Sequence, residues 1–410
     1  MTQLPEEFCS QTRLVMGEER FLQYLESFRQ DTPVSIRLNP MRTENLTVAD
    51  GEPVPWCRHA YFLPTRPNFT MDPLLHAGCY YVQEAASMFL DEVMRQQASS
   101  MIPRSSLDMC AAPGGKSTLL RAVLPEDCVL YSNEPIRQRA NILAENVAKW
   151  GYKNHFVTNA YPKDYHASKL RFDLILCDVP CSGEGMFRKD EATIREWSPQ
   201  NVEKCWRLQR EIVSEAWACL NPGGLFIYST CTFNLKENEE NRRWMLEEFN
   251  ADAVPVDVKP EWHITGSLLP GFNEPVYRFI PGITRSEGLF LCVLRKSDKM
   301  FDAKSKRNDS AHKQSLTILS PQNSQFSPQN SQFSAQKAEL DYNAAIAYLR
   351  GEALMLPSDT PRGIITVTFQ GHPIGQVKNI GTRANNLYPK EWRIKTTHTP
   401  KEYNPILKQI

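Results

Sequence analysis

Short apolar runs that alternate with helical stretches are the feature that most constrains how this chain can fold. Five such runs fall between residues 106 and 230, and helix-forming segments separate them. Strands that alternate with helices predict a parallel sheet covered by helices on both faces, a doubly wound α/β fold. The expected strands are 106–110, 129–134, 155–158, 172–178 and 225–230, and the expected helices are 118–123, 137–150 and 202–220.

The last of these helices has clear start and stop signals. Ser198 is expected to cap its first turn, because a serine hydroxyl can accept a backbone N–H there. Pro199 suits the first helical position, where the missing N–H of proline costs nothing. Pro222, Gly223 and Gly224 are expected to end the helix, since proline and glycine both interrupt it.

Length and composition narrow the class of protein. The 410 residues favour two or three domains, and 41% hydrophobic with 23% charged residues is a globular balance. Lys+Arg and Asp+Glu are equal at 47 each, so the net charge predicts no partner. The 11 cysteines form no CxxC pair, and no apolar run approaches about 18 residues. We therefore expect a reduced, cytoplasmic monomer without a disulfide framework, a metal site or a membrane span.

Changes in composition divide the rest of the chain. The segment SPQNSQF occurs twice in succession, at 320–326 and 327–333, and only Phe326 and Phe333 interrupt its polarity. Such a segment buries too little apolar surface to offset the entropy of ordering it, which predicts a flexible tether. The expected divisions are an N-terminal domain at 1–77, a central domain at 78–297, a linker at 298–338 and a C-terminal β-rich domain at 339–410.

The C-terminal part carries a local positive charge. Residues 341–410 hold nine Lys or Arg against five Asp or Glu, an excess of four. A short helix at 342–350 is expected to precede β-rich segments at 363–369 and 372–380. A basic β module is compatible with RNA binding, although a β module without any ligand would show the same pattern.

A pair of glycines follows the first expected strand, in LDMCAAPGGKS at 107–117. Ligands of open α/β sheets bind at the carboxyl ends of the strands, where glycines let the backbone approach them. The spacing excludes a P-loop, because the position that needs its first glycine is Cys110. Glu134 ends the second strand, where a carboxylate can accept both ribose hydroxyls of an adenosine-containing cofactor. The two features together favour a nucleoside cofactor.

Two cysteines follow the fourth and fifth expected strands. Cys181 lies three residues beyond Asp178, and Cys231 follows the strand at 225–230. A thiolate that adds to C6 of cytosine makes C5 nucleophilic, and a carboxyl group near N3 stabilises the charge that develops. The pattern predicts alkylation of a pyrimidine carbon, with Asp178 as that carboxyl group. The residues alone leave open which cysteine attacks.

At this point the sequence resembles a known family, the RNA cytosine-C5 methyltransferases of the Fmu/Sun type. It is most similar to the bacterial enzymes that modify 16S ribosomal RNA and carry an extra C-terminal PUA-like domain, which the tail resembles more loosely. The matching stretches are SIRLNP (35–40), YYVQEAASM (80–88), MCAAPGGKS (109–117), DVPCSGEGMFRKD (178–190), YSTCTFNLKENE (228–239) and EGLFLCVLRK (287–296).

The resemblance implies a Rossmann-like class I S-adenosylmethionine-dependent core between a small N-terminal α/β RNA-binding domain and a PUA-like RNA-binding domain. It implies that Cys231 is the nucleophile and that Cys181 assists release of the product. Asp178 would lie between cofactor and target base, and Lys189 near the target nucleotide. The implied S-adenosylmethionine-binding residues are Cys110, Ala111, Ala112, Pro113, Gly114, Gly115, Lys116, Glu134 and Asp178.

One position departs from the family pattern. Related chains carry an Asp beside the adenine after the third strand, whereas Tyr161 stands here, so Asn159, Tyr161 and Asp164 are all candidates for that contact. The implied substrate is ribosomal RNA, with transfer RNA as the second choice. Methylation of DNA cytosine is a further alternative, in which Cys181 would attack. That alternative leaves the segment 229–232 without a role.

Overall fold

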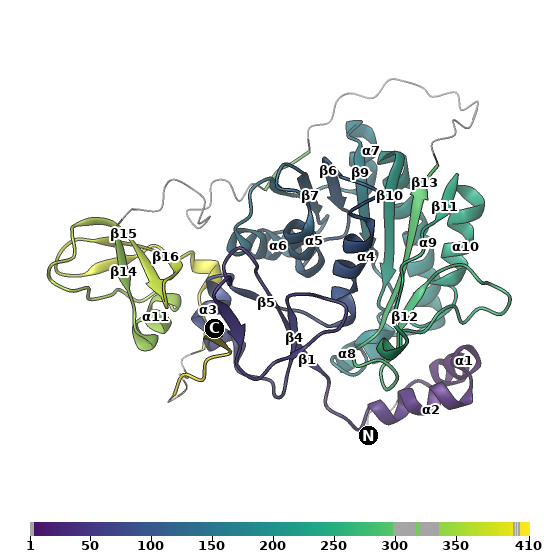
Figure 1. The fold of residues 1–410 in the computed structure, drawn as a ribbon, viewed down its shortest axis with the longest axis horizontal. Coiled ribbons are helices and arrows are strands. Elements are labelled where there is room, and N and C mark those ends of the chain that lie inside the picture. Colours follow the sequence, from purple (N-terminus) through teal and green to yellow (C-terminus); the bar gives the residue numbers. More distant parts are fainter. Residues whose placement is uncertain (1–3, 298–315, 320–335, 397, 399, 401) are drawn as a thin grey trace.

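The computed structural model describes residues 4–297, 316–319 and 336–410, apart from 397, 399 and 401. A large sheet lies at its centre, with strand order β11-β13-β10-β9-β6-β7-β8 and with β12 paired to β13 (Figure 1). Its five expected strands run parallel, which confirms the doubly wound, Rossmann-like core. They are β6 (Ser105–Asp108), β7 (Val129–Asn133), β8 (His155–Thr158), β9 (Phe172–Asp178) and β10 (Leu220–Thr230).

The opposite edge of this sheet is antiparallel, because β13 pairs antiparallel with β10. The edge strands are β11 (Ala251–Ala253), β12 (Tyr277–Phe279) and β13 (Leu289–Lys296). Among the described residues, no helix is both long enough and apolar enough to cross a membrane.

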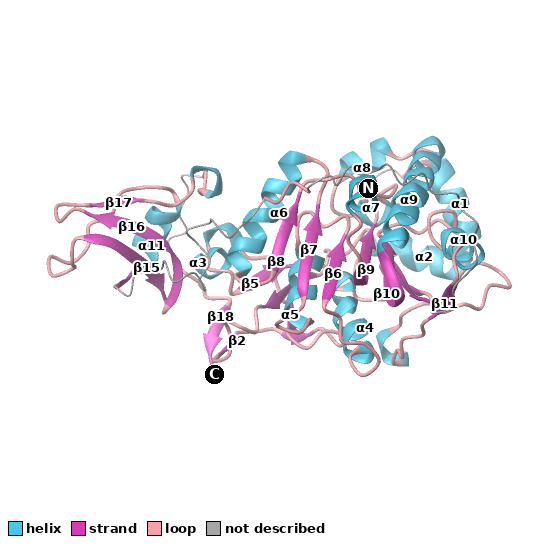
Figure 2. Cartoon of the chain, turned by 90° about the horizontal axis from the view of Figure 1, so that it is seen from above, coloured by secondary structure: helices cyan, strands magenta, loops and turns pink. Residues whose placement is uncertain are grey.

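Helices cover both faces of the sheet, as Figure 2 shows. Successive residues of β9 alternate between the faces: Leu174 and Leu176 join one apolar cluster, and Ile175 and Cys177 join the other. The first cluster includes residues of α4 (Leu90–Gln97) and α5 (Gly115–Val123), and α6 (Arg137–Trp150) packs beside α5. The second cluster includes residues of α7 (Pro162–Ser168) and α9 (Pro199–Cys219).

Helix α9 begins as expected and ends slightly early. The Ser198 hydroxyl accepts the Asn201 N–H at 3.1 Å, and Pro199 is the first helical residue. The helix stops at Cys219, and the chain passes directly into β10. Pro222, Gly223 and Gly224 therefore do not end the helix, because they lie inside the strand, where its register with β9 shifts.

The N-terminal segment divides into two parts that pack in different places. The first part consists of two helices, α1 (Glu6–Met16) and α2 (Glu18–Ser27), which Gly17 separates with a φ of 76°. Phe8 of α1 packs against Phe187 and Trp197. The helix pair α1 and α2 therefore lies against the central domain (Figure 1).

The other N-terminal part is a four-stranded sheet with order β3-β4-β1-β5. Its strands are β1 (Val34–Leu38), β3 (Glu52–Pro53), β4 (Ala60–Leu63) and β5 (Tyr80–Val82). Because β5 pairs with β1, this sheet continues past the expected domain boundary at residue 77.

The C-terminal domain packs against the N-terminal sheet region. It contains the sheet β14 (Lys337–Glu339), β15 (Gly363–Phe369), β16 (His372–Asn379) and β17 (Ala384–Asn386), together with α11 (Tyr342–Leu349). The last strand, β18 (Leu407–Gln409), pairs antiparallel with β2 (Leu46–Val48) of the N-terminal part. Buried side chains of both parts form one apolar cluster, so the domain is held by packing as well as by the chain.

The remaining short elements connect these layers. They are α3 (Pro73–His76), α8 (Glu191–Glu196), α10 (Glu239–Glu248) and the 3₁₀ helices η1 (Phe69–Met71), η2 (Ala86–Phe89), η3 (Glu184–Met186), η4 (Pro260–Trp262) and η6 (Lys390–Trp392).

The expected linker at 298–338 lies mostly outside the described residues, including both SPQNSQF repeats. Two described parts of it differ from a plain tether. Lys337 begins β14, and Ile318 forms an antiparallel bridge with Thr158 of β8. The bridge at Ile318 has a local cause: residues 316–319 are LTIL, a mostly apolar run inside an otherwise polar segment.

Candidate active site

The candidate site lies at the carboxyl ends of the parallel strands. The chain proceeds from β6 to β7 on one side and returns to β9 on the other, and this change of direction opens a crevice. The loops that follow β6, β7, β9 and β10 carry the Cys110–Lys116 segment, Glu134, Cys181 and Cys231 respectively. The sheet therefore places the expected site residues along one edge.

The two cysteines face each other across this edge. Ser229 of β10 is the register partner of Asp178 of β9, so the residues just beyond the two strands emerge side by side. The sulfur atoms of Cys181 and Cys231 lie 3.2 Å apart, and both residues are partly exposed. The hydrogen bond to Cys231, together with burial, raises the pKa of Cys181 well above its usual value. The Cys181 thiol thus holds its proton and can donate it toward Cys231.

A close backbone contact holds the two cysteine loops together. The Gly185 N–H donates to the Cys231 carbonyl at 2.6 Å. A Cβ atom at position 185 would overlap that same carbonyl and would lie 2.9 Å from the Cα of Gly288. Only glycine therefore allows this approach.

Glu184 anchors the loop that carries Cys231. Its Oε2 accepts the backbone N–H groups of Phe233 at 2.6 Å and Asn234 at 3.0 Å. Its Oε1 accepts the indole N–H of Trp197 at 3.0 Å. One buried carboxylate from the Cys181 loop thereby fixes the backbone of the Cys231 loop.

Glu237 makes the reciprocal contact. Its Oε2 accepts the Ser182 N–H at 3.0 Å and the Gln209 amide at 2.6 Å. Burial and the neighbouring charge of Glu184 raise the pKa of Glu237 to about 7, against the lowering effect of these donors. The Asn234 amide joins the two acids, donating at 3.0 Å to Glu184 and at 2.8 Å to Glu237.

These acids escaped the sequence analysis, although both lie in stretches that carry the family resemblance. The available signal was an acidic residue in each loop: Glu184 in SGEG and Glu237 in KENE. That signal indicates a buried acid, but it does not say that the two acids cross between loops.

Asp178 lies between the glycine loop and the cysteines. Its Oδ2 is 2.9 Å from the Lys116 ammonium, and its Oδ1 accepts the Ser229 hydroxyl at 2.7 Å. Burial lowers the pKa of Lys116, but the pairing with Asp178 outweighs it and raises that pKa above its usual value. The ion pair joins the start of α5 to the end of β9.

The glycine loop has the geometry that a close ligand needs. Gly114 has a φ of 116°, in the region that favours glycine, and a Cβ there would lie 3.2 Å from Leu143. Helix α5 begins at Gly115, so the free N–H groups of its first turn lie at the crevice. The Asn146 amide donates to the Pro113 carbonyl at 2.8 Å and supports the loop from α6.

Glu134 lies at the end of β7 with its carboxylate almost fully buried. Its Oε1 accepts the Ile136 N–H at 2.9 Å, and its Oε2 is 3.3 Å from Arg139. Each carboxylate oxygen can accept more than one hydrogen bond, so both retain capacity for a ribose hydroxyl. This acid, the Gly114 turn and the start of α5 fit the ribose and the carboxylate of S-adenosylmethionine.

The three candidates for the adenine contact have different surroundings. The Asn159 amide donates to the carbonyls of Glu134 and Pro135, both at 2.8 Å. Asp164 accepts the Tyr161 N–H at 2.8 Å and so caps α7. The Tyr161 side chain is 60% exposed. Asn159 and Asp164 thus already hold the loop through hydrogen bonds, whereas the Tyr161 ring is largely exposed.

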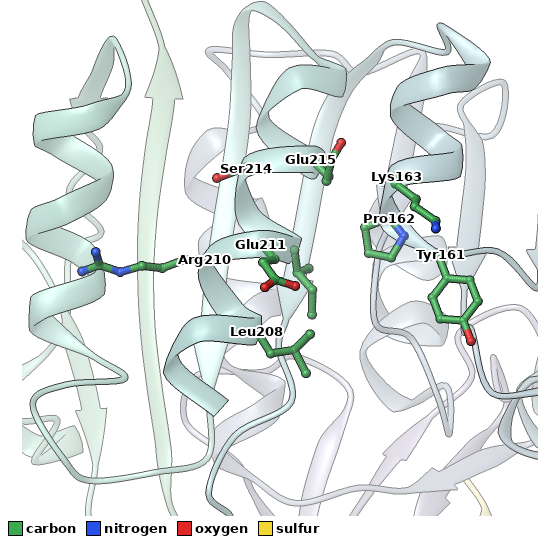
Figure 3. Close-up of a pocket in the computed structure, with 9 residues that line it drawn as sticks. Tyr161, Pro162, Lys163, Leu208, Arg210, Glu211, Ser214 and Glu215 are labelled. Carbon is green, nitrogen blue, oxygen red and sulfur yellow. The ribbon is translucent and has the colours of Figure 1, made fainter. Parts of the chain in front are cut away.

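A groove of about 680 Å³ lies next to Tyr161, between α7 and α9 (Figure 3). In the close-up, Leu208 and Glu211 lie on the α9 side, and Pro162 and Tyr161 on the α7 side. The groove adjoins the loop after β8 and contains neither cysteine.

Lys189 lies in a separate pocket of about 520 Å³ beside the Cys181 loop. Its neighbours there include Arg66, Gln83 and Glu84 from the N-terminal part. The preceding residue, Arg188, forms a buried ion pair with Glu287 at 2.6 Å. The structure therefore places Lys189 where the N-terminal sheet region meets the catalytic loop.

Family comparisons divide the chain into three successive matches. Residues 4–85 match the N-terminal domain of 16S rRNA methyltransferase RsmF, and residues 101–295 match 16S rRNA methyltransferase RsmB/F. Residues 335–394 match the methyltransferase RsmF PUA domain. The first match extends past residue 77, in agreement with the position of β5.

Individual related proteins agree with these family matches. Ribosomal RNA small subunit methyltransferase F of Escherichia coli (strain CFT073) is 33% identical over 313 residues, which cover 72% of this chain and 63% of the relative. The protein of the same name from Shigella boydii serotype 18 has the same identity and coverage. The chain thus spans a little under two thirds of the length of these relatives.

Solved structures share the fold. A methyltransferase homolog from Pyrococcus horikoshii has a TM-score of 0.58 at 24% identity, covering 71% of this chain and 95% of its own. NSun6 from the same organism, solved with SFG, has a TM-score of 0.59 at 18% identity, covering 72% and 99%. With these matches, the chain belongs to the RsmB/F family of 16S ribosomal RNA methyltransferases, whose methyl donor is S-adenosylmethionine.

Proposed function

We propose that this protein transfers a methyl group from S-adenosylmethionine to C5 of a cytosine in 16S ribosomal RNA, through a covalent bond between Cys231 and C6. The observation that carries this proposal is the pair of cysteine sulfurs, 3.2 Å apart at the ends of β9 and β10, beside Asp178. Few reactions other than pyrimidine alkylation call for two thiols and a carboxylate at one sheet edge.

The proposed reaction begins when the Cys231 thiolate bonds to C6, which moves an electron pair to C5. The bound S-adenosylmethionine supplies an electrophilic methyl group, which C5 takes as the sulfonium carbon–sulfur bond breaks. Asp178 lies where it can hold the N3 edge of the base and stabilise the charge that develops. In the last step C5 loses its proton and the C6–S bond breaks: Cys181 gives its own proton to the departing Cys231 sulfur and takes up the proton from C5, which restores the ring.

Cys181 handles a proton in the release step. The support for this division of roles is the hydrogen bond between the two sulfurs, with the raised pKa that keeps Cys181 protonated. A protonated thiol that donates to the departing sulfur stabilises it as a leaving group. Either thiol can donate in this pair, and the attack is assigned to Cys231 in keeping with the family resemblance.

We propose further that the N-terminal and C-terminal domains, which pack against each other, both bind the RNA, in a cytoplasmic monomer. The positive excess of four charges over 341–410 supports a contact with phosphates. Lys189 contacts the nucleotides next to the target, since its pocket joins the catalytic loop to the N-terminal part.

The test is bisulfite sequencing of total RNA from a deletion strain and its parent. We expect one or a few protected cytosines of 16S ribosomal RNA to lose protection, and to regain it when the wild-type gene is returned. Loss confined to transfer RNA would overturn the proposed substrate. No change at any RNA position would overturn the proposed reaction.

A further inference from the structure

A segment from the expected linker adds a short strand to the edge of the main sheet. The Asn159 N–H donates to the Thr317 carbonyl at 3.1 Å, and the Leu319 N–H donates to the Val157 carbonyl at 2.7 Å. Ile318 and Thr158 are paired between these two bonds. Residues 316–319, named here the edge segment, thus continue the sheet beyond β8.

Two leucines anchor the edge segment on opposite faces of the sheet. Leu319 packs with the apolar cluster that contains Leu143, Val147 and Val157, on the α6 side. Leu316 packs with the cluster that contains residues of α7 and α9. The Ile318 side chain, in contrast, is 47% exposed. The two anchors hold the segment through burial of apolar surface as well as through its backbone.

The edge segment reaches the cofactor side of the crevice through one residue. Asn159 receives the segment at its backbone N–H and donates its side-chain amide to the carbonyls of Glu134 and Pro135, both at 2.8 Å. Those carbonyls belong to the loop that presents the Glu134 carboxylate. A continuous path of hydrogen bonds therefore runs from Thr317 to the residue that fits the cofactor ribose.

We propose that the edge segment is a positioning element of the cofactor site: by holding Asn159 it fixes the Glu134 loop, and its release weakens binding of S-adenosylmethionine. The proposal rests on the cofactor of the proposed function but not on the identity of the RNA. It assigns the stretch between the catalytic and C-terminal domains a role in cofactor binding beyond that of a connector.

Covering an exposed sheet edge is a simpler role for such a segment, since unpaired edges promote association between chains. That role alone accounts for the bond to the Asn159 N–H, but it predicts no effect on the Glu134 loop, which the Asn159 side chain supports. The two roles predict different results for cofactor affinity, and neighbouring residues of the segment allow them to be separated.

The experiment compares Leu319→Asp with Ile318→Asp in the full chain. The substitutions are chemically matched and adjacent, but the first places a charge in an apolar cluster and the second places it where the side chain is already exposed. By titration calorimetry, we expect Leu319→Asp to raise the Kd for S-adenosylmethionine about tenfold. Ile318→Asp should stay within about twofold of the wild type.

Two further measurements separate positioning from general damage. Thermal unfolding and the Kd for RNA should be close to wild type in Leu319→Asp, since Leu319 is only partly buried against its cluster. Hydrogen exchange at the backbone N–H of Asn159 should be faster in that variant, because this N–H loses the Thr317 carbonyl as its acceptor. If Leu319→Asp fails to fold, Leu319→Ala replaces it, with the same direction of change expected.

Equal cofactor affinity in the wild type and a folded Leu319 variant with fast exchange at Asn159 would overturn the positioning role. An equal loss in the Leu319 and Ile318 variants would overturn it as well. A wild-type protein that binds no S-adenosylmethionine would instead contradict the proposed function, so the two failures are distinguishable.

Discussion

The two halves of the crevice are built by different means. The cofactor half, at β6 and β7, uses backbone geometry: a glycine with positive φ, the start of a helix, and one acid at a strand end. The cysteine half, at β9 and β10, uses side chains that cross between loops: Glu184 holds the Cys231 loop and Glu237 holds the Cys181 loop. The first half is local in sequence, whereas the second depends on contacts about 50 residues apart.

The difference has a physical consequence. A loop held by its own backbone conformation tolerates change in distant residues, because its shape is set within a few positions. Two loops held by shared buried acids form one polar network, in which an unsatisfied group costs more than the average hydrogen bond. We therefore expect changes in the cysteine half to affect covalent chemistry and stability together, and changes in the cofactor half to affect ligand affinity alone.

The largest expected effect separates the two cysteines. Cys231→Ser should reduce methyl transfer by roughly three orders of magnitude or more, because a hydroxyl without an activating base is a poor nucleophile. Cys181→Ser should still attack and methylate, but should release the product slowly. It should accumulate a covalent protein–RNA adduct, visible as a shifted band on a denaturing gel.

The double variant is the control, since no adduct can form without Cys231. An adduct that survives loss of Cys231 and vanishes with loss of Cys181 would reverse the assignment. That reversed pattern is the one expected of a DNA cytosine methyltransferase, in which the cysteine after proline attacks.

The next effect tests how the cysteine loops are held. Gly185→Ala places a Cβ against the Cys231 carbonyl, with no flexible side chain to move aside. We expect a loss of about 2–3 kcal/mol in the free energy of unfolding, together with slower adduct formation. Gly266→Ala is the matched control, because a Cβ there meets nothing within 4 Å. Equal stability and adduct rates in the two variants would show that the contact is dispensable.

The corresponding change in the cofactor half is smaller and more selective. Glu134→Ala should weaken binding of S-adenosylmethionine by about 30-fold, through loss of charge-assisted hydrogen bonds to the ribose worth about 2 kcal/mol. Calorimetry measures this directly, with the exposed Glu126→Ala as the control. Affinity for RNA should not change. A parallel loss of RNA affinity would mean that the two halves are not independent.

The same contrast explains how much the sequence could predict. Strands β7, β8 and β9 lie within one residue of their expected bounds, and the glycine loop and Glu134 occur at the expected strand ends, because each depends on local pattern. The bond between the Glu184 and Glu237 loops was not predictable, since one acidic residue in a loop does not reveal its partner. Docking of the C-terminal domain through β18 was missed for the same reason.

The linker shows the limit of composition as a guide. Averaged over 298–338, the segment is polar, and that average predicts a tether. Three of the four residues of the edge segment are apolar, and their pairing with β8 depends on an open sheet edge that sequence order does not show. The pairing also bears on truncation experiments, because removal of 341–410 spares the edge segment but uncovers the apolar cluster shared with the N-terminal part.

The smallest effect concerns the proton on Glu237. Because burial and Glu184 raise its pKa from 4.5 to about 7, the folded protein keeps this proton over a range in which the unfolded chain has lost it. The neutral acid therefore contributes stability that is complete below pH 4.5 and is lost as the pH rises through about 7.

Glu237→Gln cannot ionise, so its stability should lack this decline. Between pH 6 and pH 8, we expect the wild type to lose about 1–2 kcal/mol of unfolding free energy relative to the variant, as measured by urea denaturation. The exposed Glu247→Gln serves as the control and should follow the wild-type curve. If the wild type and Glu237→Gln run parallel across this range, the acid is already ionised in the folded state, and the cysteine half is held by a charged carboxylate instead of a neutral one.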